Sequence, residues 1–310
     1  MIDPRSNLPK IVIIGGPTCS GKSDLGLILA EKFRGEIVNA DSMQVYRYFN
    51  IGTAKPKEDV RKKIPHHLID VVNPDESFDA KRFVELADSA IHSILGKGKV
   101  PFIVGGTGLY LRALLYGLFE AKKDEDLRRR LRDEFIRDPK ALYETLLRID
   151  GEYAKKINPN DGVRIVRALE VYEVTKKKMS EWERLHGFKD ARYNALFLCL
   201  WRERKELYSR INKRVEKMLE EGWVEEVRSL LSLGFKDSLK PFKGIGYNEI
   251  LRCIKGEITY PDMIRIIKKK TRNYAKRQFV WFSKEKNAKW FLFPEQKEEI
   301  EDEVRNFLGF

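Results

Sequence analysis

An octapeptide near the start of the sequence sets the fold expected of this chain. Positions 16–23 read Gly-Pro-Thr-Cys-Ser-Gly-Lys-Ser and satisfy the pattern G-x-x-x-x-G-K-[ST] of a phosphate-binding loop. The apolar, β-branched run Lys10–Ile14 before it predicts a buried parallel strand, and Asp24–Phe33 after it predicts an amphipathic helix. Because strand, loop and helix follow one another in the order that the motif requires, they disfavour an ordinary glycine-rich turn as the alternative.

The chemistry of this loop follows from its residue types. Glycines let the backbone wrap around an anion, and the helix N-terminus contributes N–H donors and a partial positive charge. Lys22 can neutralise phosphate oxygens, and the Ser23 hydroxyl can hold Mg²⁺. We therefore expect a diphosphate-bearing molecule, whose identity the motif leaves open, to bind to Gly16, Pro17, Thr18, Cys19, Ser20, Gly21, Lys22 and Ser23.

The composition is that of a globular chain without membrane segments. Its 310 residues are 42% hydrophobic and 35% charged, which suits one large domain or two smaller ones. No run reaches the roughly 18 apolar residues of a membrane helix, and the first residues lack an apolar signal-peptide core. Cys19, Cys199 and Cys253 lie far apart and predict reduced thiols rather than disulfides or a zinc site. We expect a cytoplasmic protein with no membrane partner.

The net charge of +13 points to a polyanionic partner or substrate. A heat-adapted surface rich in Lys and Glu is the alternative, but such a surface carries both signs and leaves the cationic surplus unexplained. A nucleic acid is the favoured partner.

A second strand is predicted at Glu36–Ala40, and it ends directly before Asp41. In doubly wound parallel sheets ligands bind beyond the carboxyl ends of the strands, so Asp41 should lie beside the phosphate loop. Three roles are open to it: a magnesium ligand, a general base on the group that attacks the bound phosphate compound, or the cap of the next helix. Its position favours chemistry over capping.

A fourth strand at Val100–Val104 runs into the glycine-rich segment Gly105–Tyr110. A glycine-rich strand end belongs on the ligand side of the sheet. Thr107 within it can hydrogen-bond Asp41 or the substrate.

The stretch between these strands is expected to contribute a third strand, Leu68–Val72, and a helix, Ser77–Leu95. His66 and His67 are adjacent, so their side chains point apart, and we expect loop packing rather than a two-histidine metal site. Asp70 is a second candidate for supporting a magnesium ion.

From residue 122 to residue 189 the pattern changes to helical periodicity with heavy charge and no convincing strand. This predicts a helical insertion between two parts of a core domain, residues 1–121 and 190–310. Arg128, Arg164 and Arg167 are candidates for phosphate contacts, although a solvated helical face accounts for each of them equally well.

Strand character returns at Tyr193–Leu200, which predicts that the sheet of the core resumes, and the helix Leu207–Leu219 follows. Arg210 and Arg214 are four residues apart and share one face of that helix. There they can grip a phosphate or lie in solvent.

The most basic segment is Lys268–Phe282, which interleaves cations with aromatic residues. Such a pattern suits phosphate contacts beside base stacking in nucleic-acid binding. Under the alternative the aromatic residues belong to the core and only cations such as Lys276 and Arg277 face out, and we expect each interpretation to hold in part.

Together these motifs resemble the tRNA dimethylallyltransferase family, also called tRNA isopentenyltransferases, of the bacterial type. The resemblance spans nearly the whole chain in the family's order. It rests on Gly16–Ser23, Asp41–Tyr46, Ile51–Pro56, Pro65–Asp70, Gly105–Tyr110, Asn158–Asp161 with Arg164–Glu170, Arg210 with Arg214, Gly244–Tyr247 and Ala275–Gln278.

The resemblance implies an α/β fold: a P-loop NTPase-like parallel sheet flanked by helices, with an all-helical insertion domain that contacts tRNA. It implies transfer of a dimethylallyl group from dimethylallyl diphosphate, with Mg²⁺, to the N6 amine of the adenosine 3′-adjacent to the anticodon. Asp41 would be the base, Thr107 would orient it, and Arg214 would bind diphosphate at the reacting centre. Contacts with the tRNA anticodon stem-loop are implied for Asp41, Ser42, Met43, Gln44, Thr107, Arg128, Val163, Arg164, Arg167, Arg210, Lys276 and Arg277.

The chain departs from the family pattern at two positions. Cys19 stands where alanine is usual, which should leave a loop that binds through its backbone unaffected. Val163 stands where glutamine commonly precedes the arginine, which puts one inferred tRNA contact in question. The zinc-finger extension of eukaryotic relatives does not follow Trp290, which is the basis for expecting the bacterial type.

Two other classes of protein fit parts of the sequence. A P-loop kinase of a nucleotide or small metabolite accounts for the first 110 residues about as well, but not for the insertion or the basic aromatic segment. A nucleotide-switched nucleic-acid-binding protein is the other, and the sequence lacks the Asn-Lys-x-Asp motif of a GTPase. Nothing in the sequence demands more than a monomer.

Overall fold

A computed structural model describes residues 7–119, 121, 123–187 and 190–309 of the chain. Contacts divide the chain into two compact units, of which one comprises Met1–Leu115 and Arg192–Phe310 and the other Tyr116–Ala191. The insertion bounds expected from the sequence, 122 and 189, fall inside the second unit.

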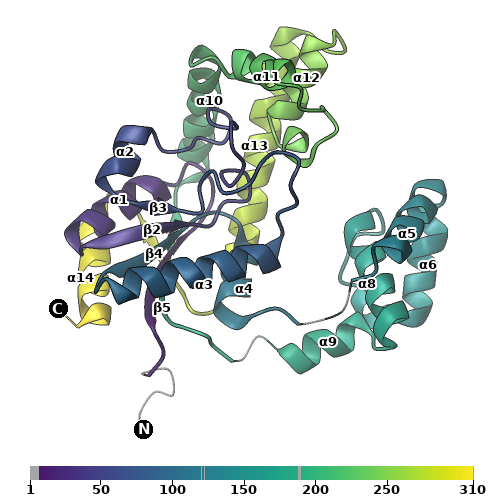
Figure 1. Cartoon of the computed structure of the whole chain (residues 1–310), viewed down its shortest axis with the longest axis horizontal. Coiled ribbons are helices and arrows are strands. Elements are labelled where there is room, and N and C mark those ends of the chain that lie inside the picture. The colour runs from purple at the N-terminus through teal and green to yellow at the C-terminus, as the bar shows by residue number, and fades with distance from the viewer. Residues whose placement is uncertain (1–6, 120, 122, 188–189, 310) are drawn as a thin grey trace. The chain divides into compact units, whose positions relative to one another are not determined.

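The first unit is built on one six-stranded sheet in the spatial order β3-β2-β4-β1-β5-β6, and every strand pair in it is parallel (Figure 1). Its strands are β1 (Lys10–Gly15), β2 (Gly35–Asn39), β3 (His66–His67), β4 (Val100–Val104), β5 (Asn194–Trp201) and β6 (Ala288–Leu292). The central strand β1 is buried from Ile11 onward, which explains why its sequence is a continuous apolar run. The strand β5 pairs with β1, so the sheet does resume after the insertion.

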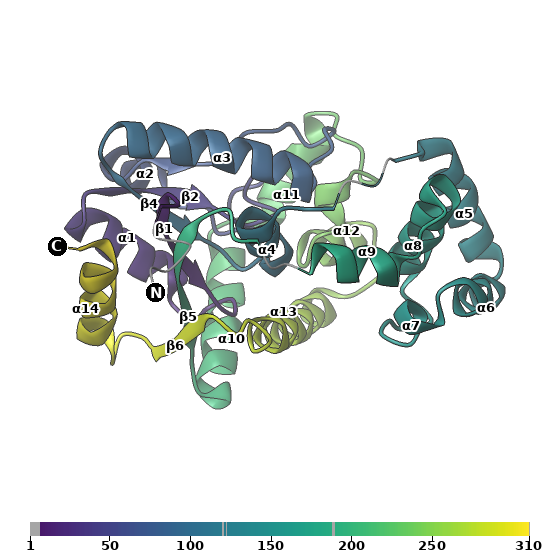
Figure 2. The same ribbon diagram turned by 90° about the horizontal axis from the view of Figure 1, so that it is seen from below.

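Helices cover this sheet, and none of those in the described chain is long and apolar enough to cross a membrane. Two of them, α10 and α13, lie side by side in both views (Figures 1 and 2), which brings the arginine-bearing helix next to the basic segment. The helices outside the insertion are α1 (Lys22–Lys32), α2 (Glu58–Lys63), α3 (Ala80–Gly96), α4 (Gly108–Tyr116), α10 (Arg204–Glu220), α11 (Trp223–Ser232), η1 (Lys240–Lys243), α12 (Tyr247–Ile254), α13 (Tyr260–Phe282) and α14 (Lys297–Leu308).

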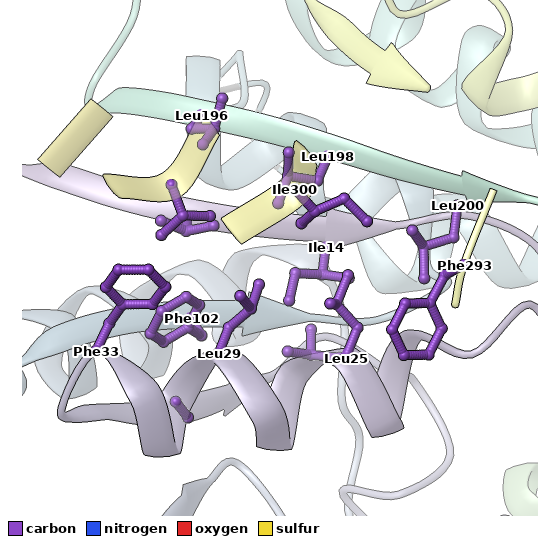
Figure 3. Packing of buried hydrophobic residues seen from close by; sticks show 14 of the residues in the cluster. Ile14, Leu25, Leu29, Phe33, Phe102, Leu196, Leu198, Leu200, Phe293 and Ile300 are labelled. Carbon is purple, nitrogen blue, oxygen red and sulfur yellow. The ribbon is translucent and has the colours of Figure 1, made fainter. Parts of the chain in front are cut away.

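The packing of α1 holds the phosphate loop at the sheet. Leu25 and Leu29, one turn apart, are fully buried, and Figure 3 shows them with Phe33 in a row facing the side chains of the strands, among them Ile14 and Phe102. Each such leucine stabilises the fold by about 1.5–3 kcal/mol through the apolar surface it removes from water. The N-terminus of α1 is therefore fixed against the carboxyl end of β1.

The second unit consists of helices with an apolar core of their own. Leu146, Ile165 and Val171 are fully buried within it. Its helices are α5 (Glu125–Arg137), α6 (Pro139–Ile149), α7 (Gly151–Ala154), α8 (Gly162–Thr175) and α9 (Met179–His186).

The third strand lies elsewhere than the sequence predicts. It consists of His66–His67 alone, and the expected segment Leu68–Val72 is not a strand. Leu68 and Asp70 have φ angles of 62° and 57°, in the left-handed region that interrupts extended pairing. Only Val72 pairs further, as an isolated bridge to Tyr46.

Candidate active site

The phosphate loop connects the end of β1 to the start of α1, as the sequence predicts. Gly16 has a φ of 128°, and a Cβ there would lie 2.4 Å from the carbonyl oxygen of Leu200 on β5. Gly21 has a φ of 104° directly before the helix. Both positions require glycine because of conformation and space together, since a Cβ on Gly21 would lie 2.7 Å from the ring of Phe293.

Lys22 is the cation of this loop. Its Nζ donates a hydrogen bond to the carbonyl oxygen of Pro17 at 2.6 Å, so the ammonium group folds back across the loop. Burial lowers the pKa of Lys22 to about 8, with the charge of Arg214 acting in the same direction and that of Asp41 opposing it. A bound anion would favour the charged form.

Asp41 follows β2 and lines the same cavity as the phosphate loop. Its Oδ1 accepts hydrogen bonds from the backbone N–H groups of Met43 at 2.8 Å and Gln44 at 3.3 Å. The following residues form turns and not a helix, so Asp41 caps a turn instead of the helix considered from the sequence. Its other oxygen, Oδ2, takes no part in these two bonds.

Thr107 supports the Asp41 turn through the backbone. Its Oγ1 accepts a hydrogen bond from the N–H of Ser42, and its own N–H donates to the carbonyl oxygen of Ala40, both at 3.2 Å. Among the described interactions Thr107 bonds to the residues on either side of Asp41 and not to the Asp41 carboxylate, which was one of the two partners considered for it. The threonine positions the turn that carries the acid.

Arg210 and Arg214 of α10 both reach the phosphate loop. The Nε of Arg210 donates to the carbonyl oxygen of Cys19 at 3.1 Å, and Nη1 of Arg214 lies 3.3 Å from the Thr18 hydroxyl oxygen. The four-residue spacing places both side chains on the face of the helix that meets the loop. Two guanidinium groups beside an anion-binding loop make this site strongly positive.

A cavity of about 500 Å³ joins these groups. Its wall combines cations and carboxylates with polar side chains, among them Lys22, Ser23, Asp24, Asp41, Gln44, Arg210, Lys213, Arg214, Tyr274 and Gln278. A second cavity of about 770 Å³ shares Ala54, Pro56 and Arg214 with it, so Arg214 borders both.

Among the wall residues that were not predicted as site residues are Tyr274 and Gln278 of α13. Burial raises the pKa of Tyr274, and the charge of Asp41 raises it further, so the phenol stays protonated. The signal in the sequence is that Gln278 falls on the same buried stripe of its helix as Ala275 and Phe282. A polar side chain on a buried stripe needs a hydrogen-bond partner there.

Candidate tRNA contacts lie in the cavity wall and on the exposed face of α13. Gln44 donates through Nε2 to the carbonyl oxygens of Thr53 and Ala54, at 2.9 and 3.2 Å, so the turn after β2 also holds the loop that follows it. On α13, Lys276 and Arg277 are exposed, whereas Phe282 is fully buried. Cations that face out and an aromatic residue in the core agree with the mixed expectation for this segment.

In the insertion two of the three candidate arginines are bound internally. Glu170 is fully buried, Nη2 of Arg128 lies 2.8 Å from its Oε2, and Nη1 of Arg167 lies 2.9 Å from the same atom. Although burial acts to raise it, the hydrogen bonds from Arg167 and Arg128 hold the pKa of Glu170 below its usual value. Arg164 and Val163 differ, because their side chains are open to solvent at the start of α8.

The histidines of β3 have separate partners. Nε2 of His67 lies 2.7 Å from Oε2 of Glu36, and Nδ1 of His66 lies 2.6 Å from the carbonyl oxygen of Ile64. Among the described residues no three His, Cys, Asp or Glu side chains gather into a group that could hold a metal ion.

The cavity nevertheless offers oxygen ligands that suit Mg²⁺. Ser23 and Asp41 both line it, and Mg²⁺ in phosphate sites takes one or two protein oxygens and completes its shell with phosphate and water. Asp70 does not fit the supporting role considered for it, because it pairs with Lys55 at 2.6 Å and Arg61 at 2.8 Å and does not line this cavity.

A parallel sheet with a phosphate loop after β1 and a carboxylate after β2 defines the P-loop class of α/β proteins. Comparison with known proteins identifies the family within this class. The sequence model of the IPP transferase family matches residues 44–285. The chain belongs to this family, the tRNA isopentenyl- or dimethylallyltransferases, and is an enzyme of prenyl transfer.

Named relatives and solved structures agree along nearly the whole chain. The tRNA dimethylallyltransferase 1 of Citrifermentans bemidjiense is 48% identical over 301 residues, 97% of each protein. The crystal structure of the full-length tRNA isopentenylpyrophosphate transferase from Bacillus halodurans has a TM-score of 0.72 at 37% identity, covering 97% of each chain. A eukaryotic dimethylallyltransferase, solved acting on tRNA, has a TM-score of 0.76 at 34% identity and covers 88% of this chain and 70% of its own.

Proposed function

We propose that this enzyme transfers the dimethylallyl group of dimethylallyl diphosphate to the N6 amine of adenosine 37, 3′-adjacent to the anticodon of tRNA, and releases diphosphate. The observation that carries the proposal is that one cavity joins a phosphate loop, two arginines and an acid after β2. The phosphate loop and the two arginines suit a prenyl diphosphate, and the acid suits an amine acceptor. The names of the relatives mention a dimethylallyl group and tRNA, which supports this choice of substrates.

The diphosphate binds to the loop from Gly16 to Ser23. Backbone N–H groups of the loop and the N-terminus of α1 face its oxygens, and Lys22 and Arg214 add positive charge. When the bond from C1 of the dimethylallyl group to oxygen breaks, negative charge grows on the leaving diphosphate. Cations already held beside this oxygen stabilise the transition state more than the ground state, which is the requirement for catalysis.

The acceptor is activated by Asp41. The lone pair of the adenine amine is delocalised into the ring, so the amine attacks poorly unless a base takes its proton. N6 forms a bond to C1 while the C1–O bond breaks, the oxygen keeps the electron pair, and the N6 proton passes to the Asp41 carboxylate and then to solvent. Thr107 holds the turn on which Asp41 stands.

Ser23 is the residue that would hold Mg²⁺ with the diphosphate, because Asp41 is assigned the role of base. When bound, the ion supplies Lewis-acid stabilisation of the leaving group. The remaining work of the site, namely binding, orientation and proton removal, belongs to the side chains described above.

The tRNA contacts are proposed on both units. The adenine must leave the anticodon-loop stack, at a cost of a few kcal/mol, and phosphate contacts offset that cost. We propose that these contacts come from Ser42, Met43, Gln44, Thr107, Arg210, Lys276 and Arg277 in the first unit, and from Val163 and Arg164 in the insertion. Arg128 and Arg167 are not among them, because their guanidinium groups pair with the buried Glu170. The enzyme would act on the anticodon stem-loop as a monomer in the cytoplasm.

Radiolabelled dimethylallyl diphosphate and unmodified tRNA test this function directly. We expect label in tRNA at the adenosine next to the anticodon, and none when that adenosine is replaced by guanosine. Phosphate transfer from ATP to a small acceptor, with no label in tRNA, would instead establish a P-loop kinase.

A further inference from the structure

Gln278 occupies a buried position between two loops of the site. It lies on α13 and its side chain is only 6% exposed. Its Oε1 accepts a hydrogen bond from the backbone N–H of Thr18 at 2.8 Å, and its Nε2 donates to the carbonyl oxygen of Gly106 at 2.9 Å. One side chain thus joins the phosphate loop to the glycine-rich segment after β4.

The phosphate loop and the glycine-rich segment together favour an uncharged amide side chain at position 278. A backbone N–H needs an acceptor and a backbone carbonyl needs a donor, and the carboxamide of glutamine offers one of each. A carboxylate would place a second acceptor against the Gly106 carbonyl, and an apolar side chain would leave both backbone groups without this partner. The two bonds also fix which end of the amide is oxygen.

The glycine at position 106 makes room for this contact. A Cβ on Gly106 would lie 2.2 Å from Nε2 of Gln278, so the amide would have to leave its present position. The backbone of the glycine-rich segment and the amide of Gln278 therefore fit each other by shape as well as by polarity.

The contact fixes the part of the phosphate loop that faces the cations. Thr18 is held by Gln278 through its N–H, and its hydroxyl oxygen lies 3.3 Å from Nη1 of Arg214. Because one residue receives both contacts, release of its backbone would also displace the hydroxyl that meets Arg214. The exposed neighbours Lys276 and Arg277 have no such contact with the loop among the described interactions.

We propose that Gln278 is a positioning residue that holds the phosphate loop in the shape that binds the diphosphate of the prenyl donor. The inference rests on the proposed function of the loop. It assigns to the basic helix α13 a second role on its buried face, distinct from the tRNA contacts proposed for its exposed face.

Three variants test this assignment. Gln278→Met keeps the length of the side chain and removes both hydrogen bonds, and Gln278→Glu keeps the acceptor for Thr18 but not the donor for Gly106. Gln296→Met is the matched control, because Gln296 makes comparable bonds, to Leu292 and Glu299, at the start of α14. The measurements are the Kd of inorganic diphosphate with Mg²⁺ by calorimetry, the KM of dimethylallyl diphosphate, the Kd of tRNA by filter binding, and hydrogen exchange of the Thr18 amide.

For Gln278→Met we expect the Kd of diphosphate and the KM of the prenyl donor to rise by about tenfold, the loss of one to two hydrogen bonds. The Kd of tRNA should change by less than about twofold, since the exposed face of the helix is untouched. The Thr18 amide should exchange faster in Gln278→Met and stay protected in Gln278→Glu, which makes the second variant informative even if the first is poorly folded. Gln296→Met should match the wild type in all four measurements.

The assignment is overturned if Gln278→Met binds diphosphate as tightly as wild type, or if tRNA and diphosphate affinities fall by the same factor. Wild-type enzyme that binds no diphosphate at all would overturn the proposed function, and this inference with it. Equal binding by wild type and variant overturns the role of Gln278 alone.

Discussion

The Nη1 atom of Arg214 lies 3.3 Å from the hydroxyl oxygen of Thr18, so a cation from α10 reaches into the phosphate loop. The charge of Arg214 also lowers the pKa of Lys22, although burial of the ammonium is the larger cause. Two like charges face one cavity, and a bound diphosphate relieves their repulsion. Binding of a multiply charged anion is therefore more favourable, because the anion offsets the repulsion between Lys22 and Arg214.

Arg214→Gln should lower kcat/KM for dimethylallyl diphosphate by about 10²–10³, because it removes a charge beside the developing leaving group. Lys217→Gln is the control on the same helix, with a side chain that is 74% exposed, and should stay within about twofold of wild type. Steady-state kinetics at saturating tRNA measures both. Equal effects of the two substitutions would mean that only the total charge of the helix matters.

Asp41→Asn should lower kcat by about 10²–10⁴ while tRNA binding is kept. Asparagine retains an Oδ1 for the N–H groups of Met43 and Gln44, so the turn survives and only the base is lost. Asp41→Ala removes base and cap together and should in addition weaken tRNA binding. Single-turnover rates and filter binding separate these effects, and an active Asp41→Asn enzyme would exclude Asp41 as the base.

Diphosphate affinity should fall as the pH rises through about 8, the pKa of Lys22 in the free enzyme. Below that pH the ammonium is charged before binding; above it, binding must first recruit a proton, which costs about tenfold in affinity per pH unit. Lys22→Arg keeps its charge throughout, and the titration of diphosphate itself affects both proteins equally. Calorimetry of the wild type and Lys22→Arg from pH 7 to pH 9.5 should show that their Kd values for diphosphate differ more as the pH rises. A constant ratio of the two Kd values over this range would contradict the lowered pKa of Lys22.

Arg128→Met should destabilise the insertion by about 3 kcal/mol, because it leaves the fully buried Glu170 with one cation fewer. Hydrogen exchange of the insertion helices measures this loss. Arg164→Gln should instead leave stability within about 0.5 kcal/mol and reduce the salt dependence of tRNA binding by about one counterion. An Arg128→Met protein of normal stability and weak tRNA binding would restore Arg128 as a phosphate contact.

The parts of the site that are local in sequence were predictable. The strand, loop and helix around Gly16–Ser23 are each predicted from residues that are neighbours in the sequence. Asp41 could be placed beside them because parallel strands end at one edge of the sheet. The face shared by Arg210 and Arg214 followed from helical periodicity, although solvent was an equal alternative.

What could not be predicted depends on contacts between distant segments or on unusual backbone angles. Gln278 meets Thr18 across 260 residues, and neither its place on a buried stripe nor the match of Ala275–Gln278 to the family pattern names that partner. Leu68 has a φ of 62° in an apolar run, and leucine gives no warning of such a conformation, so the third strand was misplaced. Arg128 and Arg167 looked like surface cations because the burial of Glu170 depends on the packing of the insertion.

The order of the strands has a consequence for how the chain is made. β1 lies at the centre of the sheet, with β4 on one side and β5 on the other, and the entire insertion is synthesised before β5. A ribosome-bound chain that ends near residue 190 therefore presents one unpaired edge of an apolar strand, the kind of edge at which partly made proteins associate. The insertion can fold on its own core in that interval, while the phosphate loop next to β1 must wait for the C-terminal third of the protein.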